Sequence, residues 1–320
     1  SLNVTVSNLG SSMLIQFAGI PEDEFQQRGL GSMRLLSCGG SPVPEYVLDS
    51  ARRRFENATI FCSYGMTECC GKISFSLPTR NIEDMPHEDR QLYINSNGRP
   101  FMTINIRIVD SKRREVPEDS RTCGEVQIQG PTLFEGYWQD STATREAFTD
   151  DGWFRTGDLG VRHPHGYISI VDRSKDMLLV GGENVYSVEV EQVLMTVPCV
   201  RTAAVVGEDD DVLGQHVVAF IELEENDDKS DVDGMIAMLK QHCVRSLADF
   251  KVPHTIYICT PGTETAIPRT GSGKIKKGEL RKRISADGDS LTLSPSLGGS
   301  VKVRRDDISG PLTPSTYAVR

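Results

Sequence analysis

The sequence lacks the features that mark several large classes of protein. No apolar run approaches the ~18 residues that a membrane-spanning helix needs. The formal net charge is −10, which argues against a general nucleic-acid or anionic-membrane surface, because such surfaces need clustered lysine and arginine. The eight cysteines are scattered without a Cys-x-x-Cys pair, so neither a zinc site nor a disulfide framework is indicated. There is no charged-then-apolar leader and no C-terminal Ser-Lys-Leu, so we expect a cytoplasmic protein.

The composition that is present describes a globular chain of about two domains. Its 320 residues are 38% hydrophobic and 25% charged, which fits two packed cores on the usual relation between length and domain number. Beyond Ser285 the sequence is rich in Ser, Gly, Pro and Asp and has no periodicity. Residues 286–320 are therefore predicted to be a disordered tail or a linker.

The first 76 residues alternate between strand and helix patterns. Apolar strands are expected at 33–38 and 59–62, with a helix over about 44–55 between them. This alternation is typical of parallel-sheet units, whose ligands lie beyond the carboxyl ends of the strands. Gly39-Gly40 and Tyr64-Gly65 follow the two strands directly, so we expect them to share a pocket.

Two further patterns follow along the chain. Short period-two strands at 105–109, 124–128 and 166–170 predict a β-rich part, with a hairpin turn rather than a metal pair at His163-Pro164-His165. A compact α+β unit is predicted after Lys175, with helices at 188–196 (N-cap Ser187) and 231–247, strands at 201–206 and 216–223, and a solvated loop at 208–211.

Four short motifs decide the interpretation. They are residues 63–68 (SYGMTE), 152–159 (GWFRTGDL), 171–184 (VDRSKDMLLVGGEN) and 268–275 (PRTGSGKI). Each resembles a motif of the adenylate-forming enzymes, the superfamily of acyl-CoA synthetases, peptide-synthetase adenylation domains and luciferases. Because all four occur in the family's order, the chain is identified as a member over roughly residues 10–285.

The resemblance implies a fold of mixed class, α/β and α+β. Residues 1–172 would be part of a large AMP-binding N-terminal domain, with an α/β layer at 1–76 and a β-rich part at 77–172. Residues 173–285 would form a small, mobile α+β C-terminal domain. Lys175 stands where the family has its hinge, which would let one domain serve two reaction steps by rotating.

The resemblance also implies a two-step reaction that uses ATP and coenzyme A. A carboxylate would attack the α-phosphate of ATP to give an acyl-adenylate and pyrophosphate, and a thiol would then displace AMP. Lys274, in a glycine-rich loop, would supply positive charge in the first step. Glu68 would hold Mg²⁺ bound to ATP, with the hydroxyl of Thr67 beside a phosphate.

Other residues of the motifs would hold the nucleotide and the thiol. Tyr64 with Gly65 would lie against adenine, while Gly39, Gly40 and Ser41 present backbone to the edge of the base. Asp158 would accept bonds from the ribose hydroxyls, and Arg173 would contact ribose or phosphate. The alternatives are a turn-forming role for Asp158 and a salt bridge from Arg173 to Asp172 or Asp176. Gly181 and Gly182 would line the path of the CoA pantetheine arm.

One element of the family is not found. The Ser/Thr/Gly-rich loop that grips the β- and γ-phosphates has no counterpart in residues 1–38, so we expect the chain to be the C-terminal portion of a longer enzyme and inactive by itself. The leading interpretation is an acid–CoA ligase acting on a fatty or aryl carboxylic acid. The alternatives are an adenylation domain that loads a carrier protein and a non-catalytic AMP-binding relative.

Overall fold

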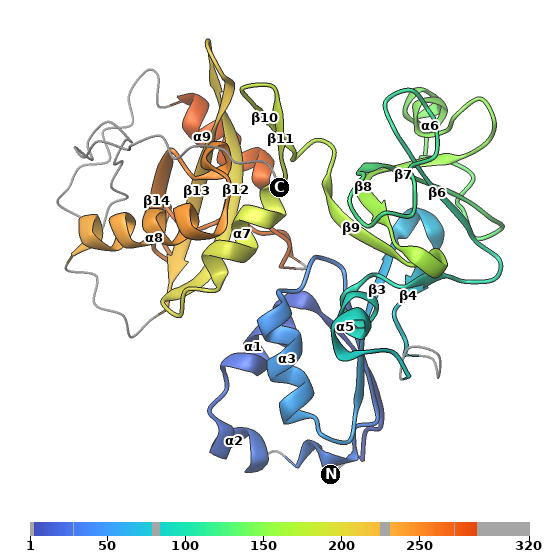
Figure 1. The fold of residues 1–320 in the computed structure, drawn as a ribbon, viewed down its shortest axis with the longest axis horizontal. Helices are drawn as coiled ribbons and strands as arrows, with labels where there is room; N and C mark the ends of the chain where they lie inside the picture. Colours follow the sequence, from blue (N-terminus) through green and yellow to red (C-terminus); the bar gives the residue numbers. More distant parts are fainter. Residues whose placement is uncertain (1–2, 28, 79–83, 225–230, 272, 287–320) are drawn as a thin grey trace. The chain divides into compact units, whose positions relative to one another are not determined.

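The chain folds into two compact units, which divide between Met177 and Leu178. The computed structural model describes residues 3–27, 29–78, 84–224, 231–271 and 273–286 (Figure 1). We call residues 1–177 the N-terminal unit and residues 178–320 the C-terminal unit. The division comes two residues after Lys175, the predicted hinge. The predicted tail at 286–320 lies outside the described residues, apart from the last residue of a helix at Ala286.

The first sheet of the N-terminal unit has five strands in the order β1-β2-β3-β4-β5. Strands β1, β2 and β3 are parallel, and β4 and β5 add antiparallel strands at one edge. The elements of this part are β1 (Val6–Gly10), α1 (Ser11–Gly19), α2 (Glu22–Gln27), η1 (Leu30–Ser32), β2 (Leu35–Gly39), α3 (Glu45–Arg54), β3 (Thr59–Met66), η2 (Thr67–Cys69), β4 (Gly71–Phe75), α5 (His87–Asn95) and β5 (Arg99–Pro100).

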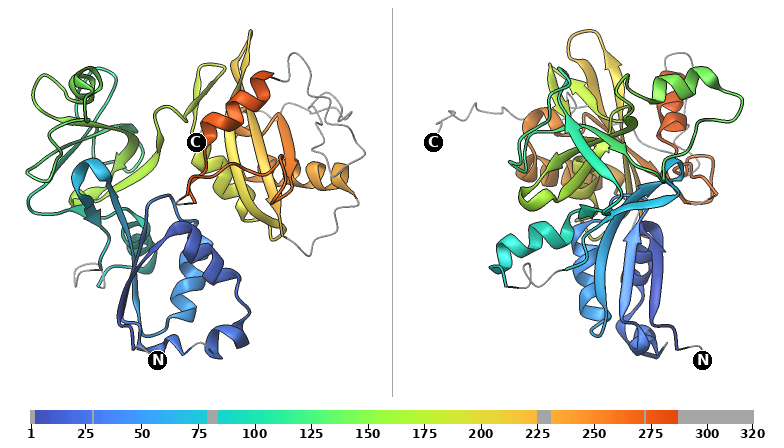
Figure 2. Two further views of the ribbon diagram at one scale, coloured as in Figure 1. Left: turned by 180° about the vertical axis from the view of Figure 1, so that it is seen from behind. Right: turned by 90° about the vertical axis from the view of Figure 1, so that its right-hand side faces the viewer.

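Helices α1 and α3 cover one face of this sheet (Figures 1 and 2). Leu36 and Cys38 of β2 pack with Ile60 and Cys62 of β3 against the two helices. Successive strand residues point to opposite faces, so Ser37 of β2 and Ser63 of β3 lie on the other face of the sheet. The expected strand at 59–62 continues to Met66 because it pairs with β4. The Tyr-Gly pair therefore lies inside a strand rather than after one.

The second sheet of the N-terminal unit is antiparallel, with the order β6-β7-β8-β9. Its elements are β6 (Asn105–Val109), β7 (Gly124–Gln129), α6 (Ser141–Ala147), β8 (Phe154–Arg162), η3 (Pro164–Gly166) and β9 (Ile168–Arg173). The predicted hairpin turn is present between β8 and β9. Helix α6, which the period-two pattern did not predict, begins where the Asp140 side chain accepts a bond from the Ala143 amide.

The C-terminal unit is an α+β sandwich around its own sheet. The elements are β10 (Leu178–Val180), β11 (Glu183–Val185), α7 (Ser187–Met195), β12 (Val200–Asp210), β13 (Gly214–Leu223), α8 (Val232–Ser246), η4 (Asp249–Lys251), β14 (Thr255–Cys259) and α9 (Lys277–Ala286). Helices α7 and α8 share one apolar cluster with the sheet, and α9 packs in a second cluster on the other face (Figure 2).

Two local expectations for this unit differ from the structure. Ser187 lies inside α7 as a buried residue that accepts a hydrogen bond from Lys277, and Tyr186 occupies the N-cap position. The acidic run at 208–211 is not a simple loop, because β12 extends through Asp210 and its carboxylate accepts two backbone bonds at the turn into β13. Turn chemistry overrides the charge pattern there.

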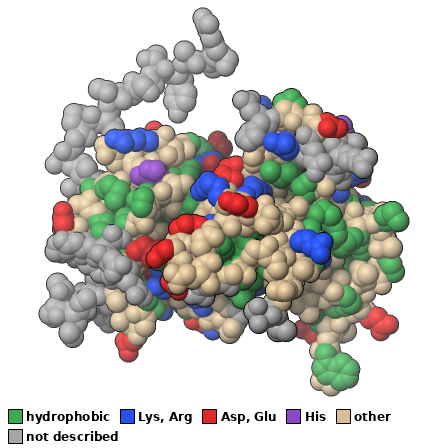
Figure 3. All heavy atoms as spheres, turned by 90° about the horizontal axis from the view of Figure 1, so that it is seen from below, with side chains coloured by type: hydrophobic (Ala, Val, Ile, Leu, Met, Phe, Trp, Pro, Cys, Tyr) green, Lys and Arg blue, Asp and Glu red, His purple; other side chains and the backbone are tan. Residues whose placement is uncertain are grey.

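No helix in the described part of the chain is long and apolar enough to cross a membrane. On the face drawn in Figure 3, acidic, basic and hydrophobic side chains are all exposed.

The hairpin turn before β9 buries His163, which predicts a pH-dependent stability. Its ring nitrogens contact the hydroxyls of Ser120 (2.9 Å) and Ser169 (2.7 Å), and burial lowers the pKa of His163 below its ordinary value. The neutral ring is thus favoured in the folded state, so its contribution to stability is complete above about pH 6.5 and is lost as the pH falls. Between about pH 7.5 and 5, we expect the urea concentration at the unfolding midpoint to fall less in His163→Gln than in the wild type.

The measurement is tryptophan fluorescence during urea unfolding, because both tryptophans of the chain, at 138 and 153, belong to the N-terminal unit. The exposed His165 supplies the control: His165→Gln should keep the wild-type pH dependence. Equal pH dependence in His163→Gln and wild type would contradict the prediction.

Candidate functional site

The first part of the candidate site is the loop that follows β2. Gly39 packs so closely on β3 that an added Cβ would come within 2.5 Å of the Ser63 carbonyl oxygen. The buried Ser11 hydroxyl at the start of α1 donates to the carbonyl of Gly39 (3.4 Å) and to that of Ser41. The backbone of residues 39–41 is therefore fixed at the carboxyl end of a parallel strand, which is where ligands of such sheets bind.

The second part is a buried carboxylate. Asp158 of β8 is 4% exposed, and one of its oxygens accepts a bond from the Tyr64 hydroxyl at 2.6 Å. Its other oxygen lies 3.3 Å from Nε of Arg173 at the end of β9. Burial, and then the Asp158 carboxylate, raises the pKa of Tyr64 well above its ordinary value, so the phenol stays a neutral donor. Three predicted site residues from three strands thus meet at one point.

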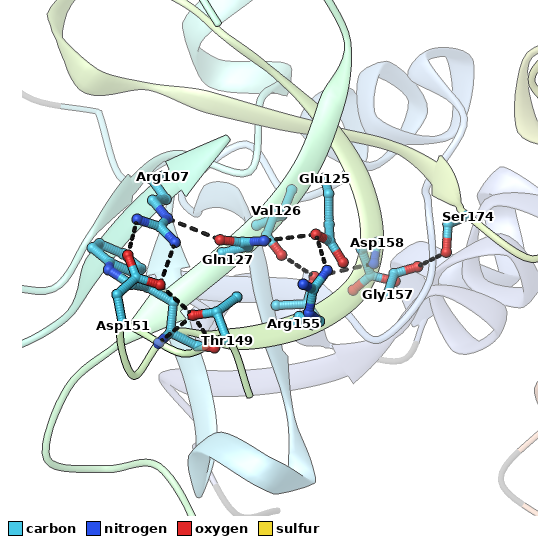
Figure 4. A network of polar contacts seen from close by, with 12 residues as sticks. Arg107, Glu125, Val126, Gln127, Thr149, Asp151, Arg155, Gly157, Asp158 and Ser174 are labelled. Carbon is cyan, nitrogen blue, oxygen red and sulfur yellow. Dashed lines mark hydrogen bonds and ion pairs between the residues drawn. The ribbon is translucent and has the colours of Figure 1, made fainter. Parts of the chain in front are cut away.

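The backbone around Asp158 is held by further hydrogen bonds (Figure 4). Its amide donates to Oγ1 of Thr156 at 3.0 Å, and that hydroxyl donates to the Val126 carbonyl at 2.7 Å. The Gly157 carbonyl accepts from both the amide (2.9 Å) and the hydroxyl (3.1 Å) of Ser174. The carboxylate is therefore positioned by its neighbours before any ligand arrives.

A row of polar side chains crosses the same sheet (Figure 4). Arg107 makes two bonds to Asp151 (2.7 and 3.1 Å) and one to Gln127 (2.8 Å). Glu125 accepts from Gln127 at 2.6 Å and from Arg155 at 3.1 Å. These pairs connect β6, β7 and β8 side by side and stiffen the sheet that carries Asp158.

The third part is Glu68, in the short helix η2 after β3. Its carboxylate accepts a bond from the Tyr137 hydroxyl at 3.2 Å, and its backbone carbonyl accepts from the Phe134 amide at 2.8 Å. Partial burial, followed by the charge of Glu68, raises the pKa of Tyr137. Thr67 beside it is exposed. Sequence reasoning missed Tyr137, because nothing in the local pattern at 136–138 indicates a contact with a residue so far away in the chain.

The predicted residues of the C-terminal unit lie in two turns. Lys274 is exposed in a tight loop in which the Thr270 amide donates to its carbonyl (2.8 Å) and its own amide donates to Thr270 Oγ1 (3.1 Å). Gly181 and Gly182, with φ of 59° and 88°, form the two-residue turn between β10 and β11. That turn explains both glycines by backbone geometry, and their place on the thiol path stays a prediction.

The predicted residues thus fall into separate groups. Asp158, Tyr64 and Arg173 meet directly. In the same unit, the loop at 39–41 begins beside Ser63 of β3, and Glu68 lies in η2 directly after β3. Lys175 is exposed in the turn that follows β9. In the ion pair that the structure records, the Arg173 guanidinium contacts Asp158. The Arg173 backbone amide donates to the Asp172 carboxylate at 2.7 Å.

Comparison with known proteins gives the family. The AMP-binding enzyme family matches residues 1–138, and the AMP-binding enzyme C-terminal domain matches residues 189–274. The chain belongs to the AMP-binding, adenylate-forming enzymes. The resemblance inferred from the four motifs is confirmed, and so is the predicted fold class of mixed α/β sheets followed by a small C-terminal domain.

Relatives of this AMP-binding chain include several CoA ligases. It is 34% identical over 274 residues to the 2-succinylbenzoate–CoA ligase of Enterococcus faecalis, covering 85% of this chain and 50% of the relative. It is 36% identical over 256 residues to the feruloyl-CoA synthase of an Amycolatopsis species, covering 80% and 47%. These relatives place it in the acyl-CoA synthetase branch of the family. The chain spans about half the length of the curated relatives that it matches.

Solved structures give the same result. The o-succinylbenzoate CoA synthetase of Bacillus subtilis, solved with the acyl-adenylate intermediate OSB-AMP, aligns with a TM-score of 0.69 at 26% identity. The alignment covers 87% of this chain and 51% of that one. The amide bond synthetase McbA of Marinactinospora thermotolerans aligns with a TM-score of 0.72 at 30% identity, covering 88% and 53%.

The close contact of β3 with β4 predicts that this AMP-binding chain does not tolerate a side chain at position 65. An added Cβ on Gly65 would come within 1.9 Å of the Gly71 carbonyl oxygen, and backbone cannot move aside as a flexible side chain can. We expect Gly65→Ala to lower the free energy of unfolding of the N-terminal unit by about 1–3 kcal/mol. Urea unfolding followed by tryptophan fluorescence measures it.

Gly31→Ala is the matched control, because nothing lies within 4 Å of a Cβ at that position. Its midpoint should stay close to that of the wild type. A Gly65→Ala protein as stable as Gly31→Ala would contradict the packing described for β3 and β4.

Proposed function

We propose that this chain carries the adenylate-binding and thioester-forming machinery of an ATP-dependent acid–CoA ligase. In the first step a carboxylate oxygen attacks the α-phosphorus of ATP, giving an acyl-adenylate and pyrophosphate. In the second, the CoA thiol loses its proton and attacks the acyl carbon, giving a thioester and AMP. The observation that carries the proposal is the buried Asp158 carboxylate, held by Tyr64 and Arg173 in a chain of the AMP-binding family.

In this proposal Asp158 binds the ribose. An ionised carboxylate only accepts hydrogen bonds and has about four acceptor positions, so it can take ribose hydroxyls as well as Tyr64 and Arg173. The guanidinium of Arg173 is 53% exposed, and its remaining donors can reach a ribose or phosphate oxygen. The backbone at 39–41 and the Tyr64–Gly65 strand would lie at the base. Tyr64 is only 8% exposed, which supports a role in holding Asp158 as well as contact with adenine.

Glu68 and Thr67 are proposed to hold the phosphate end. Mg²⁺ takes few protein carboxylates and usually keeps waters and substrate phosphates as its other ligands. The half-buried Glu68 carboxylate fits this requirement, because the Tyr137 hydroxyl donates to only one of its two oxygens. When bound, Mg²⁺ would neutralise charge on the phosphates. Thr67 would donate its hydroxyl to a phosphate oxygen.

Lys274, Lys175, Gly181 and Gly182 are proposed to serve the C-terminal unit's part of the reaction. The exposed ammonium of Lys274 would stabilise negative charge as the adenylate forms. Lys175 would be the pivot that exchanges the adenylating and thioester-forming arrangements, with the two glycines beside the pantetheine arm of CoA. The names of the related CoA ligases support CoA as the thiol. 2-Succinylbenzoate and ferulate, named in those relatives, support an aryl acid as substrate.

The ribose role of Asp158 is testable on this chain itself. We expect Asp158→Asn to weaken binding of a non-hydrolysable acyl-sulfamoyl adenosine at least about tenfold, because a charge-assisted hydrogen bond is worth about 1.5–3 kcal/mol. Isothermal titration calorimetry measures the dissociation constant. Asp150→Asn, which changes an exposed carboxylate of the same unit, should bind as the wild type does. Unchanged binding by Asp158→Asn would reject the proposed ribose contact.

The role of Lys274 is tested by separating the half-reactions, with the chain joined to the upstream residues that its relatives carry. Loss of one preorganised charge from the transition state costs on the order of 10²–10³ in rate. Lys274→Ala should therefore slow acid-dependent pyrophosphate exchange by that factor and spare thioester formation from a supplied acyl-adenylate. Lys276→Ala removes a nearby exposed ammonium and should leave both half-reactions unchanged. Equal slowing of both by Lys274→Ala would indicate a structural role.

A further inference from the structure

A polar cluster on the face of the first sheet opposite α1 and α3 is not used in the proposed reaction. Nζ of Lys72, on β4, donates to the hydroxyl of Ser37 on β2. Ser37 contacts the hydroxyl of Ser63 on β3 at 3.3 Å, and Ser63 donates to the Cys38 carbonyl at 3.1 Å. Both serines are only 5% exposed, whereas Lys72 is exposed. The cluster thus runs from solvent into the sheet.

The direction of the hydrogen bonds determines what the cluster offers to a ligand. An ammonium only donates, so Ser37 must use its own proton on Ser63, and Ser63 uses its proton on the carbonyl. Both hydroxyl protons are therefore directed inward. Of the three N–H donors of Lys72, one is used in this chain of bonds, and no ion pair joins it to a carboxylate in the described parts of the chain. Lys72 therefore offers a ligand a positive charge and the N–H donors that this chain of bonds does not use.

The electrostatic setting of the ammonium supports this interpretation. Desolvation by burial lowers the pKa of Lys72 from its ordinary value, with the nearby Cys38 acting in the opposite direction. A cation that has lost hydration and has no carboxylate partner gains from an anion placed beside it. A bound anion would supply the missing partner.

The cluster adjoins the candidate adenylate site. Ser63 is the register partner of Gly39, and Lys72 is the register partner of Gly65. Both partners are proposed to lie at the nucleotide, at the carboxyl ends of β2 and β3. An acyl group attached to the adenylate would therefore start next to this face of the sheet.

We infer that Lys72, supported by Ser37 and Ser63, forms a subsite for a second acidic group on the carboxylic acid substrate. The acid would be a dicarboxylate, with one carboxylate adenylated and the other paired with the Lys72 ammonium. This inference rests on the proposed function, because it needs an acyl-adenylate in the neighbouring site. Both serine hydroxyl protons are used within the protein, so neither serine donates to a ligand. The cluster would therefore recognise the negative charge of the second acidic group rather than its shape.

The test is calorimetry on the 320-residue chain with two series of acyl-sulfamoyl adenosines, matched in tail length. One series ends in a carboxylate and the other in a carboxamide, which has similar size and no charge. We expect the wild type to prefer a carboxylate tail of suitable length by about tenfold, and the preference to shrink with added salt. Lys72→Met should abolish the preference by weakening carboxylate binding alone, while Lys72→Arg should retain it.

Lys112→Met is the control, because it removes an exposed lysine from a turn of the other sheet of the same unit. It should leave both dissociation constants unchanged. A wild type that binds both series equally at every length would overturn the subsite and leave the proposed function standing. Equal weakening of both series in Lys72→Met would also overturn it, by placing Lys72 at the reacting end. Failure of every adenosine compound to bind would reject the proposed function and the subsite with it.

Discussion

The N-terminal unit depends on one buried carboxylate. Asp158 cannot be buried without partners, because an ionised group removed from water costs several kcal/mol unless it is paired and hydrogen-bonded. Tyr64 and Arg173 supply those partners from β3 and β9. The bond from Tyr64 crosses from the first sheet to the second, so the interaction that solvates the charge also fixes the two sheets against each other. Glu125, Gln127 and their arginine partners then stiffen the second sheet around it.

The C-terminal unit uses the same arrangement for the loop that carries Lys274. Glu222 of β13 is 2% exposed, and its oxygens accept from the Ile267 amide at 3.0 Å and from Arg269 at 3.1 Å. These bonds hold the start of the loop on the sheet, while Lys274 extends into solvent at its far side. The base of the loop is therefore fixed, while the lysine that the proposal assigns to adenylate formation is accessible from solvent.

The sequence predicted the secondary-structure elements better than it predicted contacts between residues. Period-two strands such as 105–109 agree with the structure to the residue, because alternation follows from a half-buried sheet. Asp158 and Arg173 were both predicted for the ribose, yet nothing in their spacing indicated that they pair with each other. Tyr137 was missed for the same reason, since its partner Glu68 is brought near only by folding. Long-range pairs depend on how the sheets pack, which local patterns do not encode.

The close pairing of predicted ligand-binding residues has a physical consequence for binding. A buried carboxylate without partners would destabilise the protein in the absence of ligand. Asp158 avoids this cost, because Arg173 and Tyr64 already pair with it and orient it. Its acceptor positions are more numerous than these two donors, so under the proposed function ribose would add to the arrangement without displacing either donor. Binding would then cost little reorganisation, which is how preorganised sites gain affinity. Lys72 is the opposite case: its charge has only hydroxyl support within the described chain, and a ligand carboxylate would complete it.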